Sequence, residues 1–196
     1  MPASEAASVR RREILTAASR LFRERGLQRV GMREIARELG CTAGNIYYYF
    51  PSKTDLLAYC QEATLDELLA VAEQIAGDDD TATIRLGRLI RAHIVCLNET
   101  YPGSLAHLEV ETLEPDRRAE LLAKRHRYQR LIEEMIAEGI RRGELEVPSP
   151  RLAALALLGA VNWTVKWFSV DGELEAGTVG EVFSGMLLDG LRRREA

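Results

Sequence analysis

The chain has 196 residues, of which 46% are hydrophobic and 29% charged, a composition typical of a folded globular protein. Its three cysteines are an odd number and widely spaced, which indicates reduced thiols and excludes a disulfide framework. No charge-free apolar run of about eighteen residues occurs, and no apolar signal core precedes the N-terminal arginines. We therefore expect a cytoplasmic protein with no membrane partner.

Charge is unevenly distributed along the chain. Residues 1–53 contain ten Lys and Arg against five Glu, a local charge of +5, so residues 54–196 carry −9 to give the overall −4. An acidic protein still binds DNA when its basic side chains are gathered on one face. This pattern predicts a DNA-binding domain over residues 1–53 and a second domain over residues 54–196. Residues 1–8 are small and polar, and we expect them to be disordered.

Two short helices joined by a glycine turn are predicted within residues 30–53. Apolar residues recur at helical spacing from Met32 onward, and Gly40 supplies a left-handed C-cap. Thr42 can cap the second helix, which is about two turns long because Pro51 stops it from continuing. This arrangement predicts a helix-turn-helix, which places its second helix in the major groove of DNA.

The second of these helices has too little apolar surface to be a core helix. Tyr48 and Tyr49 can cover sugars and thymine methyl groups and donate to phosphates, and Lys53 can bind a phosphate at the next helix N-terminus. For Tyr47 and Phe50, the spacing favours packing in an aromatic cluster that holds the three helices together.

Beyond residue 53 the chain reads as consecutive helices with no strand-like alternation and no internal repeat. Glycine, proline and acidic residues mark the ends of six further helices. With the three helices before residue 53, this predicts an all-α fold of about nine helices. The six are expected over residues 52–75, around 86–97, around 105–108, 115–142, 151–168 and 175–193.

The last two predicted helices carry more apolar surface than one small helical domain can bury. Small residues on both would let the helices approach closely. Surplus apolar surface predicts a partner, and we expect a homodimer, the alternative being that both helices are simply core. The residues expected at the dimer interface are Leu152, Ala156, Gly159, Val179, Phe183, Met186 and Leu187.

Residues 10–55 resemble the DNA-binding domain of the TetR (tetracycline repressor) family of bacterial transcription regulators. The family's pattern is matched at Gly26, Ile35, Ala36, Gly40, Tyr47, Phe50 and Lys53. The resemblance implies groove-reading roles for Arg33, Thr42, Ala43, Gly44 and Asn45, and phosphate-binding roles for Tyr47, Tyr48, Tyr49 and Lys53. The chain departs from the pattern at Gly31, usually a hydroxyl residue, and at Tyr49, usually His. The resemblance also implies that two helices of each subunit form a four-helix dimer interface.

The resemblance further implies that the second domain senses a small molecule. Asn162, Trp163, Lys166 and Trp167 form two i, i+4 pairs, which would place an amide and a cation beside two indoles. Such a wall suits an apolar ligand with a polar or anionic end. The same run resembles the acyl-CoA-responsive branch of the family. The expected effector-binding residues are His93, Arg125, Tyr128, Asn162, Trp163, Lys166 and Trp167.

Two of these expectations have a simpler alternative. A basic run over residues 117–130 could hold the phosphates of an effector, but charge runs are usually solvated, and nearby glutamates over residues 133–138 could neutralise it. His93 lies on an apolar stripe, where a histidine is more often a hydrogen-bonded core residue than a ligand contact.

Other classes of protein fit the sequence less well. An enzyme would need a nucleophile elbow, a phosphate-binding glycine loop or a paired acid and base, and we find none. Glu109 and Glu111 near His107 leave a metal sensor open, although the three histidines lack metal-ligand spacing, and no metal or cofactor is expected. A protein-interaction scaffold would leave the aromatic second helix unexplained.

The sequence therefore predicts a DNA-binding transcription regulator, expected to be a repressor that leaves a palindromic operator when an effector binds. The expected effector is an acyl-CoA or a similar amphipathic anion from lipid or sterol breakdown. The alternative is a sensor of hydrophobic drugs or neutral metabolites. Its partners would be double-stranded operator DNA, the small-molecule effector and a second copy of the chain.

Overall fold

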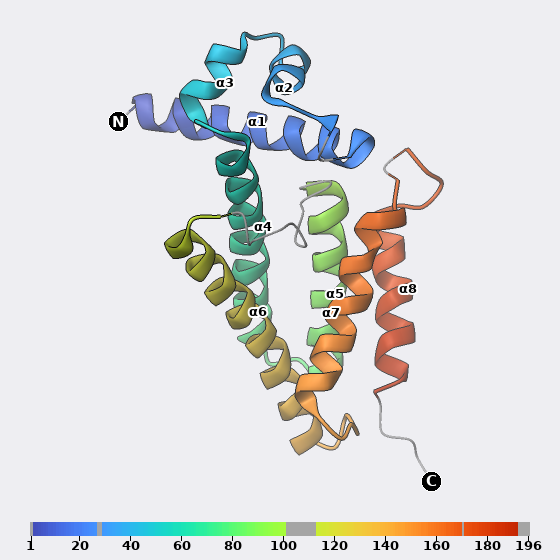
Figure 1. Ribbon diagram of the computed structural model, residues 1–196. Coiled ribbons are helices and arrows are strands. Elements are labelled where there is room, and N and C mark those ends of the chain that lie inside the picture. Colours follow the sequence, from blue (N-terminus) through green and yellow to red (C-terminus); the bar gives the residue numbers. More distant parts are fainter. Residues whose placement is uncertain (1, 27–28, 101–112, 170, 192–196) are drawn as a thin grey trace.

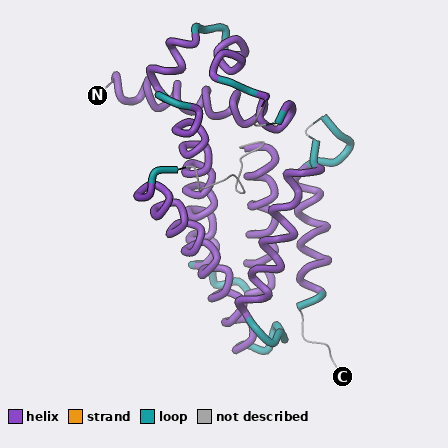
Figure 2. The backbone as a smooth tube through the Cα atoms, viewed as in Figure 1, coloured by secondary structure: helices purple, strands orange, loops and turns teal. Residues whose placement is uncertain are grey.

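The computed structural model describes residues 2–26, 29–100, 113–169 and 171–191, and within these ranges helices and short turns make up the chain, with no strand. Figure 2 shows this all-helical path. The predicted all-α class is confirmed.

The elements are α1 (Pro2–Arg25), α2 (Met32–Glu38), α3 (Ala43–Tyr49), α4 (Lys53–Ala76), α5 (Ala82–Val95), the π-helical η2 (Cys96–Thr100), α6 (Pro115–Arg141), α7 (Pro150–Trp167) and α8 (Ala176–Asp189). The expected short helix around residues 105–108 lies outside the described residues.

The first three helices form a unit at one end of the molecule, and α4 runs from this unit along the larger domain (Figure 1). Gly40 adopts the predicted left-handed conformation, with φ of 61°. Thr42 Oγ1 accepts a hydrogen bond from the backbone N–H of Asn45 at 3.3 Å, and Ser52 Oγ accepts one from Asp55 at 3.0 Å. The turn and both helix starts in the predicted helix-turn-helix are therefore confirmed.

The expectation that residues 1–8 are disordered was wrong. Helix α1 begins at Pro2 and continues without a break to Arg25. Proline is well placed at the first position of a helix, because the N–H that it lacks would have no partner there. The alanines that follow have high helix propensity, so the small residues of this segment extend the helix.

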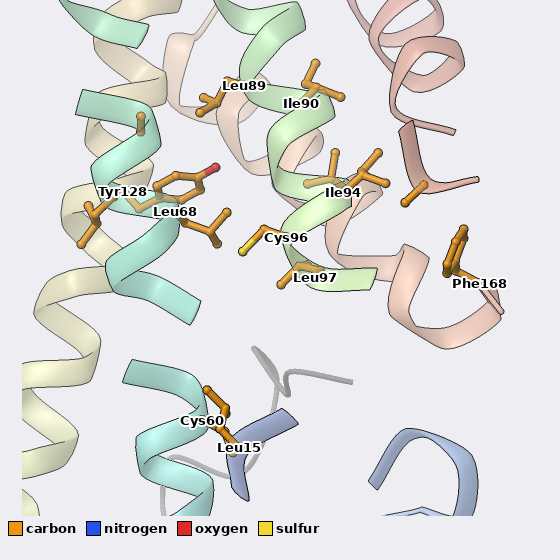
Figure 3. Close-up of a cluster of buried hydrophobic side chains, with 14 of the residues drawn as sticks. Leu15, Cys60, Leu68, Leu89, Ile90, Ile94, Cys96, Leu97, Tyr128 and Phe168 are labelled. Carbon is orange, nitrogen blue, oxygen red and sulfur yellow. The ribbon is translucent and has the colours of Figure 1, made fainter. Parts of the chain in front are cut away.

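Helix α5 is the centre of the larger domain and contacts α4, α6, α7 and α8. Helix α8 packs most closely on it, because a Cβ atom added to Gly180 would lie 2.8 Å from the Cα of Arg91. Figure 3 shows buried side chains, with Cys96 in the cluster around α5 and Cys60 of α4 beside Leu15 of α1. Burial raises the pKa of both thiols to about 12, so they stay protonated and pack as small apolar groups.

The π-helical turn η2 continues α5 and is hydrogen-bonded to α7. The side-chain amide of Asn98 donates hydrogen bonds to the carbonyl of Ile94 and to Thr164 Oγ1, both at 2.8 Å. Asn98 and Thr164 are almost completely buried, so this contact fixes the two helices against each other inside the core. Within the described residues, no helix is both long and apolar enough to cross a membrane.

Candidate DNA interface and effector site

Helix α3 presents a mostly exposed polar surface at the end of the molecule. Thr42, Gly44, Asn45 and Tyr48 are exposed, with Tyr48 82% exposed, and Ala43 is half-buried. Ile46 is fully buried and anchors the helix on the core of the unit. Thr42, Gly44 and Asn45 are among the residues to which the resemblance gives a groove-reading role, and Arg33, also in that set, is exposed on the neighbouring α2. Tyr48 is one of those given a phosphate-binding role.

The aromatic residues in and just after α3 are not buried and exposed in the way that the sequence predicted. Phe50 is 4% exposed and lies 5.2 Å from the ring of Tyr59, as predicted for a packing residue. Tyr47 is 49% exposed, so its assignment to the packing cluster was wrong. Ile46 and Phe50, one helical turn apart, take the inward positions, and Tyr47 is turned away from them. Tyr47 therefore joins Tyr48 on the accessible surface.

Lys53 lies at the N-terminus of α4, beside the junction with α3. Its Nζ atom is 5.6 Å from the centroid of the Phe22 ring, and partial burial lowers its pKa. The aromatic contact places the ammonium group against α1, while the backbone N–H groups and the dipole at the start of α4 favour an anion beside this residue. This geometry suits the phosphate contact expected for Lys53.

Three of the residues expected to bind an effector come together in the interior of the larger domain. His93 on α5 lies between Tyr128 on α6 and Asn162 on α7. Its Nδ1 atom is 2.9 Å from the Tyr128 hydroxyl, and its Nε2 atom is 3.0 Å from Oδ1 of Asn162. His93 and Tyr128 are each 3% exposed, and burial raises the pKa of Tyr128, which stays a neutral phenol.

A small cavity adjoins this polar group. Its volume is about 10 Å³, roughly enough for one water molecule. Apart from His93 and Tyr128, its lining is apolar and consists of Leu86, Leu89, Ile90, Ile132, Leu157, Leu158 and Val161. A wider groove of about 840 Å³ runs between α1 and α2, but it is an open surface feature with Arg12, Glu13, Arg20 and Glu38 in its walls. The interior cavity is the better match to an apolar ligand.

The expected tryptophan wall does not face this cavity. Trp163 is 63% and Trp167 45% exposed, and Lys166 is also exposed. The i, i+4 spacing places these residues on one face of α7, but the inward face carries Leu157 and Val161. The assignment of Trp163, Lys166 and Trp167 to the cavity wall is therefore corrected.

The outward face of α7 is instead continuous with the residues expected at a dimer interface. Leu152, Ala156 and Gly159 are exposed on it, and Trp167 contacts Phe183 of α8 at a ring distance of 6.1 Å. On α8, Met186 is 72% exposed, while Phe183 and Leu187 are half-buried. Val179 differs because it is 5% exposed and packs in the core of its own protomer. Val182, 53% exposed, was missed although it belongs to the same stripe.

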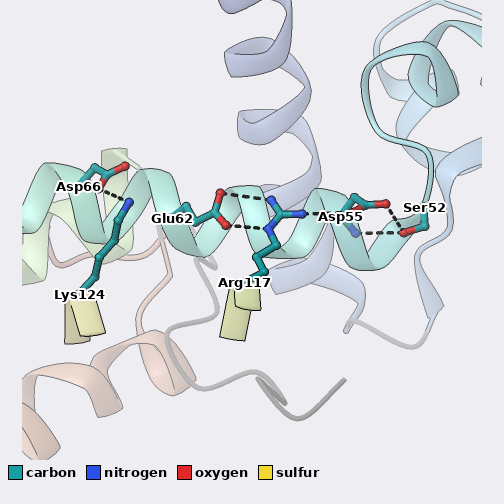
Figure 4. A network of polar contacts seen from close by, with 6 residues as sticks. All are labelled: Ser52, Asp55, Glu62, Asp66, Arg117 and Lys124. Atoms are coloured by element: carbon teal, nitrogen blue, oxygen red, sulfur yellow. Dashed lines mark hydrogen bonds and ion pairs between the residues drawn. The ribbon is translucent and has the colours of Figure 1, made fainter. Parts of the chain in front are cut away.

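The basic run of α6 is paired with carboxylates of α4, as Figure 4 shows. Arg117 contacts Glu62 at 2.7 Å and Asp55 at 3.1 Å. Farther along the helix, Lys124 pairs with Asp66 and Arg127 with Glu73. We name this series the α4–α6 ladder. The sequence left open whether the run holds phosphates, is solvated or is partly neutralised by the glutamates of α6, and the structure pairs these cations with carboxylates of a different helix.

Arg125 is turned toward α4, and its guanidinium donates to Oε1 of the buried Gln61 at 3.0 Å. Burial lowers the pKa of Arg125. This residue lies one turn before Tyr128 on α6, but its side chain is directed to α4 and it is absent from the lining of the cavity at His93. The histidine and glutamates considered for a metal sensor, His107, Glu109 and Glu111, lie outside the described residues, which contain no group of three metal-binding side chains.

Comparisons with known proteins agree with this geometry. The family description "Bacterial regulatory proteins, tetR family" matches residues 14–60, and "Tetracyclin repressor-like, C-terminal domain" matches residues 79–191, more than half of the chain. The chain is 26% identical over 191 residues to the HTH-type transcriptional repressor KstR2 of Rhodococcus jostii (strain RHA1), covering 94% of this chain and 92% of that protein.

Two further similarities concern acyl metabolism. The chain is 23% identical to the fatty acid metabolism regulator protein of Bacillus subtilis (strain 168), over 93% of this chain and 95% of that protein. The solved structure of AibR in complex with isovaleryl coenzyme A and operator DNA matches with a TM-score of 0.75 and 27% identity, over 91% of this chain and 98% of that chain. Members of the matched family are transcription regulators, so the expectation of a regulator and not an enzyme is confirmed. The chain belongs to the TetR family of bacterial transcription regulators.

Proposed function

We propose that the protein is a dimeric repressor that leaves its operator when a coenzyme A thioester or a similar amphipathic anion binds between α5, α6 and α7. The observation that carries this proposal is the apolar cavity that lies beside the buried hydrogen-bonded pair of His93 and Tyr128. This combination suits the acyl part of such a ligand, which is mostly apolar and has few oxygen atoms. The names of the similar proteins, which refer to fatty acid metabolism and to isovaleryl coenzyme A, support the same class of ligand.

In this proposal, residues 1–53 bind DNA, and residues 54–196 bind the effector and form the dimer. A second copy would pack on the exposed face of α7 and α8, where Leu152 and Met186 are 65% and 72% exposed. Two such protomers carry two recognition helices related by a two-fold axis. These would enter successive major grooves about 34 Å or more apart on one side of the duplex.

The coupling between the two sites follows from α4, which belongs to both domains. The cavity is about 10 Å³ and has no room for an acyl chain, so ligand binding must separate α5, α6 and α7. Helix α6 is tied to α4 by the α4–α6 ladder, and any displacement of α6 is passed to the helix that supports α3. A ligand that prefers the displaced state lowers the affinity of the protein for DNA. By linkage, bound DNA lowers the affinity of the protein for that ligand by the same factor. A hundredfold effect needs only about 2.7 kcal/mol.

Calorimetry with short-chain, medium-chain, long-chain and ring-bearing acyl-CoAs tests the proposal, with free coenzyme A as the control. We expect at least one thioester to bind more tightly than free coenzyme A and to release the protein from operator DNA selected with the protein itself. Absence of binding by every thioester at submillimolar concentration would reject this effector class.

The second candidate is a sensor of a neutral hydrophobic molecule. It is favoured by the pairing of Arg117, Lys124 and Arg127 with carboxylates of α4, which occupies three cations that an anionic effector would use. The calorimetric panel distinguishes the two, because a neutral-ligand sensor would bind none of the thioesters.

A further inference from the structure

We propose that Tyr128, His93 and Asn162 form a hydrogen-bond chain that recognises one oxygen atom on the apolar part of the effector, and that this chain can run in either direction. It would therefore accept both a hydroxyl and a keto group and disfavour a plain hydrocarbon at that position. The inference rests on the proposed function and names the kind of thioester that the site selects. Its basis is the placement of the chain at the wall of the interior cavity.

In the first direction, the proton positions follow from the contacts. Oδ1 of Asn162 can only accept, so Nε2 of His93 carries a proton and donates to it across 3.0 Å. A neutral imidazole then has an unprotonated Nδ1, which accepts the hydroxyl proton of Tyr128 across 2.9 Å. The Tyr128 oxygen keeps its lone pairs. In this state the chain offers an acceptor, and the matching effector group is a hydroxyl.

In the second direction, every bond of the chain is reversed. The amide of Asn162 turns over and donates from its NH₂ group to Nε2 of His93, and Nδ1 carries the imidazole proton and donates to the Tyr128 oxygen. The phenol proton of Tyr128 is then free to donate to a ligand. In this state the chain offers a donor, and the matching effector group is a carbonyl. All three side chains keep their mutual hydrogen bonds in both directions, and in the second direction the phenol proton of Tyr128 gains its acceptor from the ligand.

The surroundings make the chain selective. The other described side chains that line the cavity are apolar, among them Leu89, Ile132 and Val161, and the closed cavity exposes no polar surface. The Tyr128 hydroxyl and His93 are therefore the polar groups that an effector would meet among these residues once α5, α6 and α7 separate. A hydrogen bond made inside an apolar cavity does not compete with water. An effector that lacks the oxygen loses that bond, and we expect it to bind about tenfold more weakly, since an unmade buried hydrogen bond costs about 1–3 kcal/mol.

The first test measures binding of octanoyl-CoA, β-hydroxyoctanoyl-CoA and β-oxooctanoyl-CoA by calorimetry. These three thioesters share a chain length and differ only in the oxygen that the chain would recognise. We expect both oxygenated thioesters to bind about tenfold more tightly than octanoyl-CoA to the parent protein. Tyr128→Phe should abolish this preference, so that the three thioesters bind with similar affinities. Tyr59→Phe is the matched control, because Tyr59 packs on Phe50 near α3, and it should retain the preference.

The second test follows the direction of the chain itself. The protein has three histidines, so side-chain ¹⁵N resonances can be assigned to His93 with one His93→Gln variant. The β-hydroxy thioester should leave the imidazole proton on Nε2, and the β-oxo thioester should move it to Nδ1. The same tautomer in both complexes would overturn the reversible direction.

The remaining outcomes separate this inference from the proposed function. Equal binding of all three thioesters, with no effect of Tyr128→Phe, would reject the hydrogen-bond chain as a recognition element and leave the proposed effector class intact. An equal loss for all three in Tyr128→Phe would show that the chain contacts the thioester carbonyl that they share, and would also reject the selectivity. No binding by any of the three would overturn the inference for this chain length, and the proposed coenzyme A ligand would fall with it only if the short-chain, long-chain and ring-bearing acyl-CoAs also failed to bind.

Discussion

Individual side chains of the DNA-binding unit are expected to differ in how they contribute to operator binding. Asn45 is exposed on α3, where its amide can reach base edges, whereas Lys53 sits at a helix N-terminus suited to phosphate. Asn45→Ala should weaken binding and relax base preference. Lys53→Ala should weaken binding to all sequences and lower the slope of log affinity against log salt by about one.

Fluorescence anisotropy at several salt concentrations measures both effects. Arg130→Ala, which removes an exposed cation of α6, is the control for charge alone. A salt slope that falls equally in the Arg130 and Lys53 variants would contradict a phosphate contact by Lys53.

An ion pair between the buried Arg85 and the half-buried Glu138 makes stability depend on pH. Arg85 is 4% exposed and donates to Glu138 at 2.6 Å and to the carbonyl of Ala76 at 3.1 Å. The hydrogen bond from Arg85 lowers the pKa of Glu138 below its ordinary value of 4.5. A carboxylate with a lowered pKa stabilises the fold above 4.5, and this contribution is lost as pH falls through the folded-state pKa.

Glu138→Gln should lower the thermal midpoint at neutral pH, because it leaves the Arg85 charge buried without a carboxylate. The double variant Arg85→Met with Glu138→Leu should recover much of this loss and weaken the pH dependence below 4.5. Thermal unfolding monitored by circular dichroism across the acid range is the measurement. A single variant as stable as the double variant would show that the pair is not needed.

The residues that sequence reasoning placed correctly are those with a local signature. Gly40 and Thr42 have the backbone conformation and cap that their residue types favour, so they could be read from the sequence. Trp163 and Trp167 could not, because i, i+4 spacing shows that residues share a face but not which face turns inward. The contact between His93 and Tyr128 could be predicted only in part. A polar residue on an apolar stripe indicates that His93 is buried, but it does not identify the side chain that hydrogen-bonds to it.

At the scale of elements, Arg117 is the contact of the α4–α6 ladder nearest to the DNA-binding unit. It reaches Asp55, whose carboxylate also accepts the Ser52 hydroxyl at the start of α4. Arg117→Met should therefore weaken the effect of the effector on operator affinity. The variant should still bind operator DNA alone and the effector alone. Lys124→Met is the matched control, because Lys124 contacts Asp66 farther from the start of α4 and should disturb the coupling less.

The measurement compares operator affinity with and without the thioester that binds most tightly, for the parent and both variants. The ratio of the two affinities should approach one in Arg117→Met. An unchanged ratio in Arg117→Met, with a lower one in Lys124→Met, would place the coupling elsewhere in the interface.

The bounds of the helices could be predicted more closely than the contacts between them. Pro115 and Gly143 mark the ends of α6 through local backbone chemistry, and the observed helix agrees with them. The ladder could not be predicted, because it pairs α6 with carboxylates about sixty positions earlier in the chain, on α4. Nearby glutamates in the sequence were an equally reasonable set of partners until the two helices were placed side by side.

At the scale of the whole molecule, the exposed apolar face of α7 and α8 predicts a dimer. Met186→Glu should produce monomers, because Met186 is 72% exposed and a charge there would be buried in the interface. Val9→Glu is the control, since Val9 is 54% exposed on α1, away from this face. Light scattering at micromolar concentration is the measurement, and a monomeric parent protein would contradict the proposed interface.

We expect two copies of this chain to read a two-fold-related operator with their α3 helices. The decisive measurement is selection of binding sequences from a random pool of duplex DNA, followed by footprinting of the selected sequences. It should yield an inverted repeat whose half-sites lie on the same side of the duplex, with centres about 34 Å or more apart, and a relaxed preference for that repeat in Asn45→Ala. A single asymmetric half-site bound as tightly as the repeat, or no sequence preference at all, would show that the chain does not read DNA in this way.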